Sequence, residues 1–194
     1  MSQTLTTELE AVNYMLRTAG ERPVAALGSD TPVTKASIAR DILRDESRSF
    51  QEKGWSFNSE TEYPLTPLST TKEIILPANV LRCDPVDRTL DYVQRGSKLY
   101  NRVNHTYRFD GAVSVDIVWF LPWEELPEAA RKYVKVKAAR VFQKQSIGDP
   151  QQVSITEEEE TRAWVDFLDS EAEVNEPNFL VNIPALNRYT NPPR

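Results

Sequence analysis

The chain has 194 residues, of which 40% are hydrophobic and 27% charged. This composition is typical of a folded domain with a real core and excludes a disordered chain. The formal net charge of −6 argues against a protein that grips nucleic-acid phosphates, because such proteins are basic. The same charge is compatible with a surface along which a nucleic acid moves without being bound.

Three further features concern the compartment. Cys83 is the only cysteine, so an internal disulfide framework is impossible. The sequence has no apolar run near the roughly 18 residues of a membrane span. The opening residues Met1–Thr4 lack the basic segment and apolar core of a signal peptide. We therefore expect assembly in the cytoplasm, without a membrane.

Two helices are predicted at the start of the chain. Thr7 is a good N-cap for the first, Gly20 suits a left-handed C′ position, and Pro23 prevents continuation. The second is predicted to begin near Thr31-Pro32 and to end at Gly54. Its expected buried face consists of Ile38, Ala39, Ile42, Leu43 and Phe50.

The β signals lie between residues 55 and 120, where frequent prolines exclude a long helix. Val113–Trp119 alternates apolar and polar residues and is the clearest strand. Arg95–Lys98 has the composition of a hairpin turn. Shorter strand candidates are Ile74–Leu76, Val80–Leu81, Tyr92–Val93 and Leu99–Tyr100.

Two more helices are predicted after the strands. Pro127 suits the first turn of the third, and the fourth runs from about Pro150 to Val174. The fold class is therefore α+β, a bundle of about four α-helices with a small β subdomain inserted between helices 2 and 3, followed by an extended C-terminal arm. The expected bounds are 1–56 and 121–174 for the bundle, 57–120 for the β subdomain and 175–194 for the arm.

Several short patterns occur in a fixed order along the chain. The first is Glu8-Leu9-x-x-Val12-Asn13-x-x-Leu16 followed by Gly20-Glu21-x-Pro23-Val24, and the second is Phe50-x-x-x-Gly54-Trp55-x-Phe57-Asn58. Arg95-Gly96, Leu99–Arg102, Arg108–Asp110, Leu126–Glu128 and Lys137–Phe142 follow. This ordered set resembles the tail tubular protein A family of short-tailed (podoviral) phages, over roughly residues 8 to 175.

The resemblance implies a structural virion protein rather than an enzyme, with no cofactor. It implies a ring of about twelve copies that joins the portal protein to the tail nozzle protein, of the tail tubular protein B type. DNA would pass through this ring without specific binding, and the protein would end in the virion tail after assembly in the host cytoplasm.

Two charged segments are candidate assembly surfaces. The segment from Glu157 to Glu176 contains nine acidic residues and one basic residue, which gives a local charge of about −8. The run Glu157, Glu158, Glu159 and Glu160 is either a solvated face, a channel lining that repels DNA, or a contact with a neighbouring subunit. The complementary basic patch of the third helix includes Arg131, Lys135 and Arg140, with Lys132, Lys137 and Lys144 beside them.

The C-terminal tail is rich in proline yet keeps apolar residues that a disordered tail would lack. Its two interpretations are a frayed end and an arm that becomes ordered on a partner. The resemblance implies that this partner is the portal. The candidate portal-docking residues are Phe179, Leu180, Val181, Ile183, Leu186 and Tyr189.

Signals for catalysis are sparse. His105 is the only histidine, and neither a nucleophile elbow nor a phosphate-binding glycine loop is present. A thiol dyad of Cys83 and His105 lacks a local signature, and the ligands for a zinc site are missing. The alternative function is a tail-associated polysaccharide hydrolase with a carboxylate pair, although no motif selects the pair.

Overall fold

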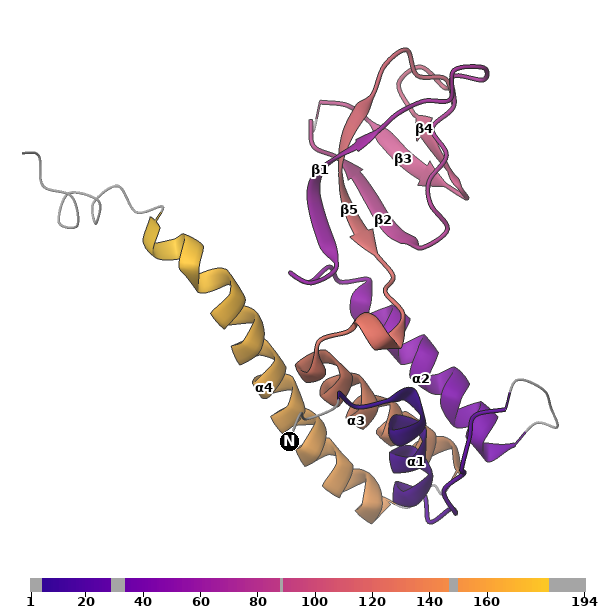
Figure 1. Cartoon of the computed structure of the whole chain (residues 1–194), viewed down its shortest axis with the longest axis vertical. Helices are drawn as coiled ribbons and strands as arrows, with labels where there is room; N and C mark the ends of the chain where they lie inside the picture. The colour runs from indigo at the N-terminus through magenta and orange to yellow at the C-terminus, as the bar shows by residue number, and fades with distance from the viewer. Residues whose placement is uncertain (1–4, 29–33, 88, 147–149, 182–194) are drawn as a thin grey trace, which may run out of the picture. The chain divides into compact units, whose positions relative to one another are not determined.

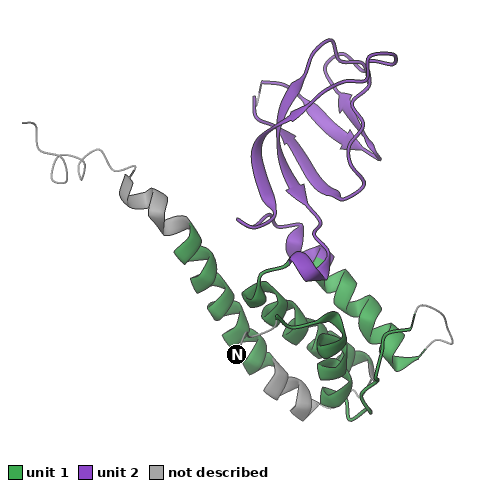
Figure 2. Ribbon diagram, in the orientation of Figure 1, with its two compact units in different colours: residues 1–47, 126–194 green, residues 48–125 purple. Residues whose placement is uncertain are grey.

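A computed structural model describes residues 5–28, 34–87, 89–146 and 150–181, with side chains described for residues 157–174 of the last segment. The chain divides into two compact units, residues 1–47 with 126–194, and residues 48–125 (Figure 2). In these described segments, four α-helices and small antiparallel sheets make up the fold, and the strands separate the second helix from the third. The α+β prediction is confirmed.

Unit 1 is helical. It contains α1 (Glu8–Thr18), most of α2 (Lys35–Gln51), α3 (Glu128–Ser146) and α4 (Pro150–Val181). α3 lies between α1 and α4 and packs on both of them (Figure 1). Among the described residues no helix has the length and apolarity needed to cross a membrane.

The first helix forms as its sequence predicts. Thr7 is the N-cap and makes a reciprocal capping box with Glu10. At the other end Gly20 has φ +72°, its N–H donates to Arg17 O, and the N–H of Glu21 donates to Leu16 O at 2.8 Å. This is the Schellman arrangement, which only a residue tolerant of positive φ completes without strain.

An asparagine side chain closes the loop after α1. Asn13 Nδ2 donates to Val24 O at 2.9 Å, and the Val24 N–H donates back to Asn13 Oδ1 at 2.8 Å. The Asn13 and Pro23-Val24 elements of the first sequence pattern therefore form one two-way amide clamp. The pattern has a structural role.

α2 differs from its prediction in two respects. Thr34 and Ser37 exchange side-chain hydrogen bonds at its start, so Thr34 caps the helix, whereas the expected start at Thr31-Pro32 lies outside the described residues. Ile38 was expected to be buried and is 39% exposed, because it lies at the edge of the stripe formed by the buried residues. Those buried residues are Ala39, Ile42, Leu43, Ser47 and Phe50.

Ion pairs attach α2 to its neighbours in unit 1. Arg40 forms a bidentate pair with Glu8 at 2.9 and 3.0 Å, and Arg44 adds a contact at 3.3 Å. Burial opposes ionisation of Glu8, but the two guanidinium groups hold the pKa of that carboxyl below its usual range. Lys137 of α3 pairs with Glu46 at 2.9 Å.

Unit 2 contains a three-stranded antiparallel sheet of order β1-β5-β2 and the hairpin β3-β4. The strands are β1 (Ser59–Leu65), β2 (Val80–Pro85), β3 (Tyr92–Arg95), β4 (Lys98–Asn101) and β5 (Val113–Trp119), and the short 3-10 helix η1 (Trp123–Glu125) follows. Pro64 and Pro85 lie on the two edge strands, where a missing N–H is tolerated.

The strand expected at Ile74–Leu76 is wrong. This segment makes an isolated bridge between Ile75 and Lys98, and the Leu99 N–H donates to Ile74 O. Ile74 and Leu76 are buried while Ile75 is exposed, so the alternation is real. Pro77 follows at once and limits the pairing to single bridges.

The second sequence pattern forms a joint at the end of α2. Asn58 Nδ2 donates to Gln51 O at 3.0 Å and to Trp119 O at 2.7 Å, and its Oδ1 accepts from the Trp55 N–H at 2.8 Å. Gln51 is fully buried and exchanges two hydrogen bonds with the backbone of Leu121. The joint is therefore made of neutral amides.

Gly54 and Gly20 provide a matched test of the backbone. Both have positive φ, +79° and +72°, but a Cβ at Gly54 would lie 3.1 Å from Ser59 Oγ and from Val118 Cγ2, whereas a Cβ at Gly20 would meet open space. We expect Gly20→Val to cost about 1–2 kcal/mol of unfolding free energy. Gly54→Val should cost about 1–3 kcal/mol more, because crowding adds to the strain. Urea unfolding of the two variants compares them, and equal losses would contradict this account.

Candidate assembly surfaces

Several basic residues of α3 form ion pairs within the chain. Lys132 pairs with Asp166, and Arg140 pairs with Glu160 and, at 3.3 Å, with Glu157. Because 132 lies opposite 166 and 140 opposite 157, α3 and α4 are antiparallel. Two of the cations that we expected on a surface patch, Lys132 and Arg140, therefore pair with α4 of the same chain, and Arg140 pairs with the acidic run itself.

Arg131 was also expected on that surface patch, and it is buried instead. It is 4% exposed, with Nε donating to Leu126 O at 2.8 Å and NH1 donating to Thr6 O at 2.9 Å. The Thr6 N–H and hydroxyl both donate to Glu128 at the start of α3. Arg131 is thus part of a latch that holds the segment before α1 to α3. Spacing along a helix does not reveal this role, because the partner backbone lies 125 residues away.

Tyr14 of α1 completes this charged layer. Its hydroxyl donates to Glu159 at 2.5 Å, and Lys135 Nζ lies 5.1 Å from the centre of its ring. Burial and the hydrogen bond to Glu159 raise the pKa of Tyr14, so the hydroxyl stays protonated and remains a donor. Of the four successive glutamates, Glu158 is the one whose side chain forms no hydrogen bond or ion pair with the described part of the chain.

The two faces of α4 differ sharply. Its inner face buries Ala163 and Phe167, and Trp164 packs at 4.9 Å between ring centres on Tyr133 of α3. Its outer face exposes Val165 by 49% and Leu168 by 40%. Single exposed apolar residues are ordinary, but a second apolar stripe on one helix indicates a partner surface.

α4 also continues beyond α3. Lys132 lies level with Asp166, so the first residue of α3, Glu128, lies level with about residue 170, while α4 runs on to Val181 (Figure 1). The remaining turns extend about 15 Å at 1.5 Å per residue, and Val174 within them is 60% exposed.

The expected end of α4 and the expected arm need a correction. We predicted that the helix ends near Val174 and that an extended arm starts at residue 175, but residues 175–181 are helical. Pro177 weakens a helix interior without forbidding it, since it removes one hydrogen bond. Phe179, Leu180 and Val181 therefore lie on the last turns of α4. Ile183, Leu186 and Tyr189 lie outside the described residues.

The two residues considered for a thiol dyad, Cys83 and His105, lie in different environments. Cys83 is buried, and burial together with Asp84 raises the pKa of its thiol to about 11. A thiol of this kind is a poor nucleophile near neutral pH. His105 is exposed in a turn at φ +51°. Within the described ranges no three His, Cys, Asp or Glu side chains are placed to hold a metal ion.

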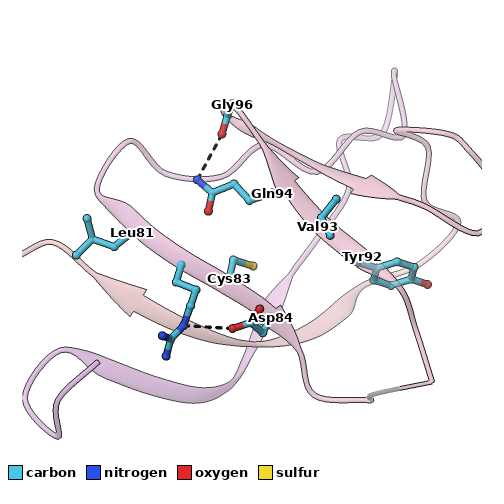
Figure 3. A pocket seen from close by; sticks show the side chains of 8 residues that line it. Leu81, Cys83, Asp84, Tyr92, Val93, Gln94 and Gly96 are labelled. Atoms are coloured by element: carbon cyan, nitrogen blue, oxygen red, sulfur yellow. Dashed lines mark hydrogen bonds and ion pairs between the residues drawn. The ribbon is translucent and has the colours of Figure 1, made fainter. Parts of the chain in front are cut away.

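An open cavity of about 500 Å³ lies beside Cys83. Figure 3 shows that its labelled lining residues come from β2 and β3, with Gly96 in the hairpin turn. Its polar groups pair with each other, Arg82 with Asp84 at 3.2 Å and Gln94 with Gly96 O at 3.4 Å. The carboxylate of Asp84 and the amide of Gln94 are thus engaged within the protein.

Many charged side chains of the helical unit thus hold the fold together, as Arg131 and Arg140 do, and α4 in addition exposes the apolar residues Val165 and Leu168. The family model described as tail tubular protein matches residues 9–177. Tail tubular protein A of Klebsiella phage KP34 is 30% identical over 154 residues, which cover 79% of this chain and 81% of that protein.

The protein is therefore a structural component of a phage tail and not an enzyme. More specifically, the chain belongs to the tail tubular protein family. The resemblance inferred from the ordered motifs is confirmed.

Proposed function

We propose that the protein forms the ring-shaped adaptor between the portal and the nozzle of a short-tailed phage, and that the ring encloses the DNA exit channel. The observation that carries this proposal is α4, which exposes Val165, Leu168 and Val174 and extends beyond the helix on which it packs. A closed ring, of about twelve copies in this proposal, covers such a surface by joining two different patches of neighbouring copies.

The end of the chain is the proposed contact with the portal. The last turns of α4 extend past the start of α3, and in this proposal they meet the portal. The nozzle protein would bind elsewhere on the ring. Family membership supports an assembly with other tail proteins, and the named partners follow from the adaptor role proposed here.

Imaging tests the adaptor role directly. The purified full chain is examined by negative-stain electron microscopy, alone and mixed with portal protein from the same phage. We expect rings of one size, and portal complexes that carry one ring each. A protein that stays monomeric with and without the portal would overturn the proposal.

The acidic run is the proposed channel wall. A ring repeats the surplus of negative charge in every subunit, and a negative wall keeps phosphates from binding during DNA exit. Within the run, Glu160 pairs with Arg140, whereas the side chain of Glu158 is exposed and forms no hydrogen bond or ion pair in the described chain. Glu158 is therefore the residue whose charge is available to the channel.

Charge reversal of Glu158 tests this wall. In phage that carry Glu158→Lys, particles should assemble normally and eject DNA more slowly at low ionic strength, with the delay lost as salt rises. Glu158→Gln is the control and should behave almost as the wild type. Normal ejection by Glu158→Lys at low salt would mean that this position does not face the channel.

A further inference from the structure

The β3-β4 hairpin has an ordered outer surface. Leu99 of β4 and Ile74 beside it are buried, so their sequence neighbours point to the opposite side, because side chains alternate along extended chain. We call this surface the hairpin face. It consists of Glu73, Ile75, Arg95, Lys98, Tyr100 and Tyr107.

The side chains of the hairpin face are packed against one another. The Arg95 guanidinium carbon lies 3.7 Å from the Tyr100 ring centre, and Tyr107 meets Tyr100 edge to face at 4.8 Å. Lys98 pairs with Glu73 at 2.9 Å, which neutralises both charges. Ile75 remains 44% exposed and Tyr107 36% exposed.

This composition indicates a protein-binding surface. Tyrosine and arginine, together with tryptophan, are enriched at interface hot spots. Arg95 is the one charge of the hairpin face without a carboxylate partner in the described chain, so the face is apolar with a net charge of +1. A fitting partner is apolar and acidic.

The outer face of α4 has the complementary composition. Val165, Leu168 and Ala172 recur at i, i+3 and i+7, which places them on one stripe. Asp169 and Glu173 flank this stripe, are exposed, and form no ion pair within the described ranges. We call these five residues the α4 outer face.

A nucleic-acid partner fits the hairpin face less well. Bases stack on open aromatic faces, but Arg95 covers one face of Tyr100 and Tyr107 packs against the same ring. One unpaired cation gives little counterion release, and the whole chain carries a charge of −6.

We propose that the hairpin face of one copy binds the α4 outer face of the next copy in the ring, with Arg95 facing Asp169 and Glu173. This inference rests on the proposed ring. Head-to-tail contacts in a closed ring join two different patches of the same chain. The two faces are apolar and opposite in charge, which fixes the choice of partner and the register of the contact.

A charge swap in the full chain tests the contact. Arg95→Glu and Asp169→Arg should each lower the fraction of protein sedimenting as rings at least about tenfold, since each places like charges together. The double variant Arg95→Glu with Asp169→Arg should restore most of the assembly, because every interface then carries the reversed pair. Arg22→Glu, which makes the same charge change at an exposed residue outside both faces, should assemble as the wild type does.

The outcomes separate this contact from the ring itself. If the wild type forms no rings, the proposed function fails and this contact fails with it. If the wild type forms rings and folded Arg95→Glu also forms them, the ring stands and the contact is overturned. Loss of assembly without rescue by the double variant also overturns it. A short labelled DNA duplex that binds the wild type, but not Arg95→Glu, while ring assembly is unchanged would overturn it in favour of nucleic acid.

Discussion

A chain that ends at Val174 should keep its fold and lose its binding to the portal. Among the α4 residues whose side chains the structure describes, the contacts with α3 run from Arg140–Glu160 to Tyr133–Phe167 and lie before this point. The removed residues include the helical turns that outrun α3, so their loss should change the melting temperature by no more than about 2 °C. Co-sedimentation with portal rings should fall to background.

A second truncation makes this result sharper. A chain that ends at Val181 keeps all of α4 and removes only residues 182–194. Binding by the Val181 chain, but not by the Val174 chain, would assign docking to the helical turns. Undiminished binding by both would contradict a C-terminal portal contact, and a large loss of thermal stability would mean that the end belongs to the domain core.

Arg131→Ala should be among the most destabilising single changes in the helical unit. It would remove the donors that Arg131 supplies to the carbonyl oxygens of Leu126, in a buried hydrogen bond, and of Thr6, in a partly buried one. Losing charge-assisted hydrogen bonds and stranding two acceptors costs about 3 kcal/mol. For a chain of this length that is a fall of about 6–12 °C in melting temperature.

Two comparisons identify the cause of that loss. Arg131→Met keeps much of the side-chain volume without the donors, so it should lose nearly as much stability if hydrogen bonding dominates. Lys132→Ala removes an ion pair whose side chains are half exposed and should cost less than about 1 kcal/mol. Equal effects of Arg131→Ala and Lys132→Ala in calorimetry would mean that Arg131 is not a structural latch.

The elements with local signals could be predicted from the sequence. Three such elements depend only on residues that are close in sequence, and the structure has each of them. They are the Thr7 cap, the helix end at Gly20 and the alternation of Val113–Trp119. The family resemblance was also predictable, because its motifs are short and ordered. Two residues of these motifs, Asn13 and Asn58, each close a joint with backbone atoms.

The failures concern interactions at long range. No residue close to Arg131 in the sequence indicates that a carbonyl 125 residues away will accept its hydrogen bond. The basic patch of α3 and the acidic run of α4 were both visible, but sequence could not tell pairing within a chain from pairing between chains. The end of α4 was misplaced because Pro177 was given more weight than the helix allows.

The amide joints at Asn13 and Asn58 give the protein a particular tolerance. A tail component leaves the cell with the virion and then meets media of any ionic strength. Screening by dissolved ions weakens exposed pairs such as Lys132–Asp166, but it has no net charge to act on at an asparagine that bonds to carbonyl and N–H groups. The stability of the two amide joints should therefore not depend on salt concentration. Salt should instead weaken the ion pairs between α3 and α4.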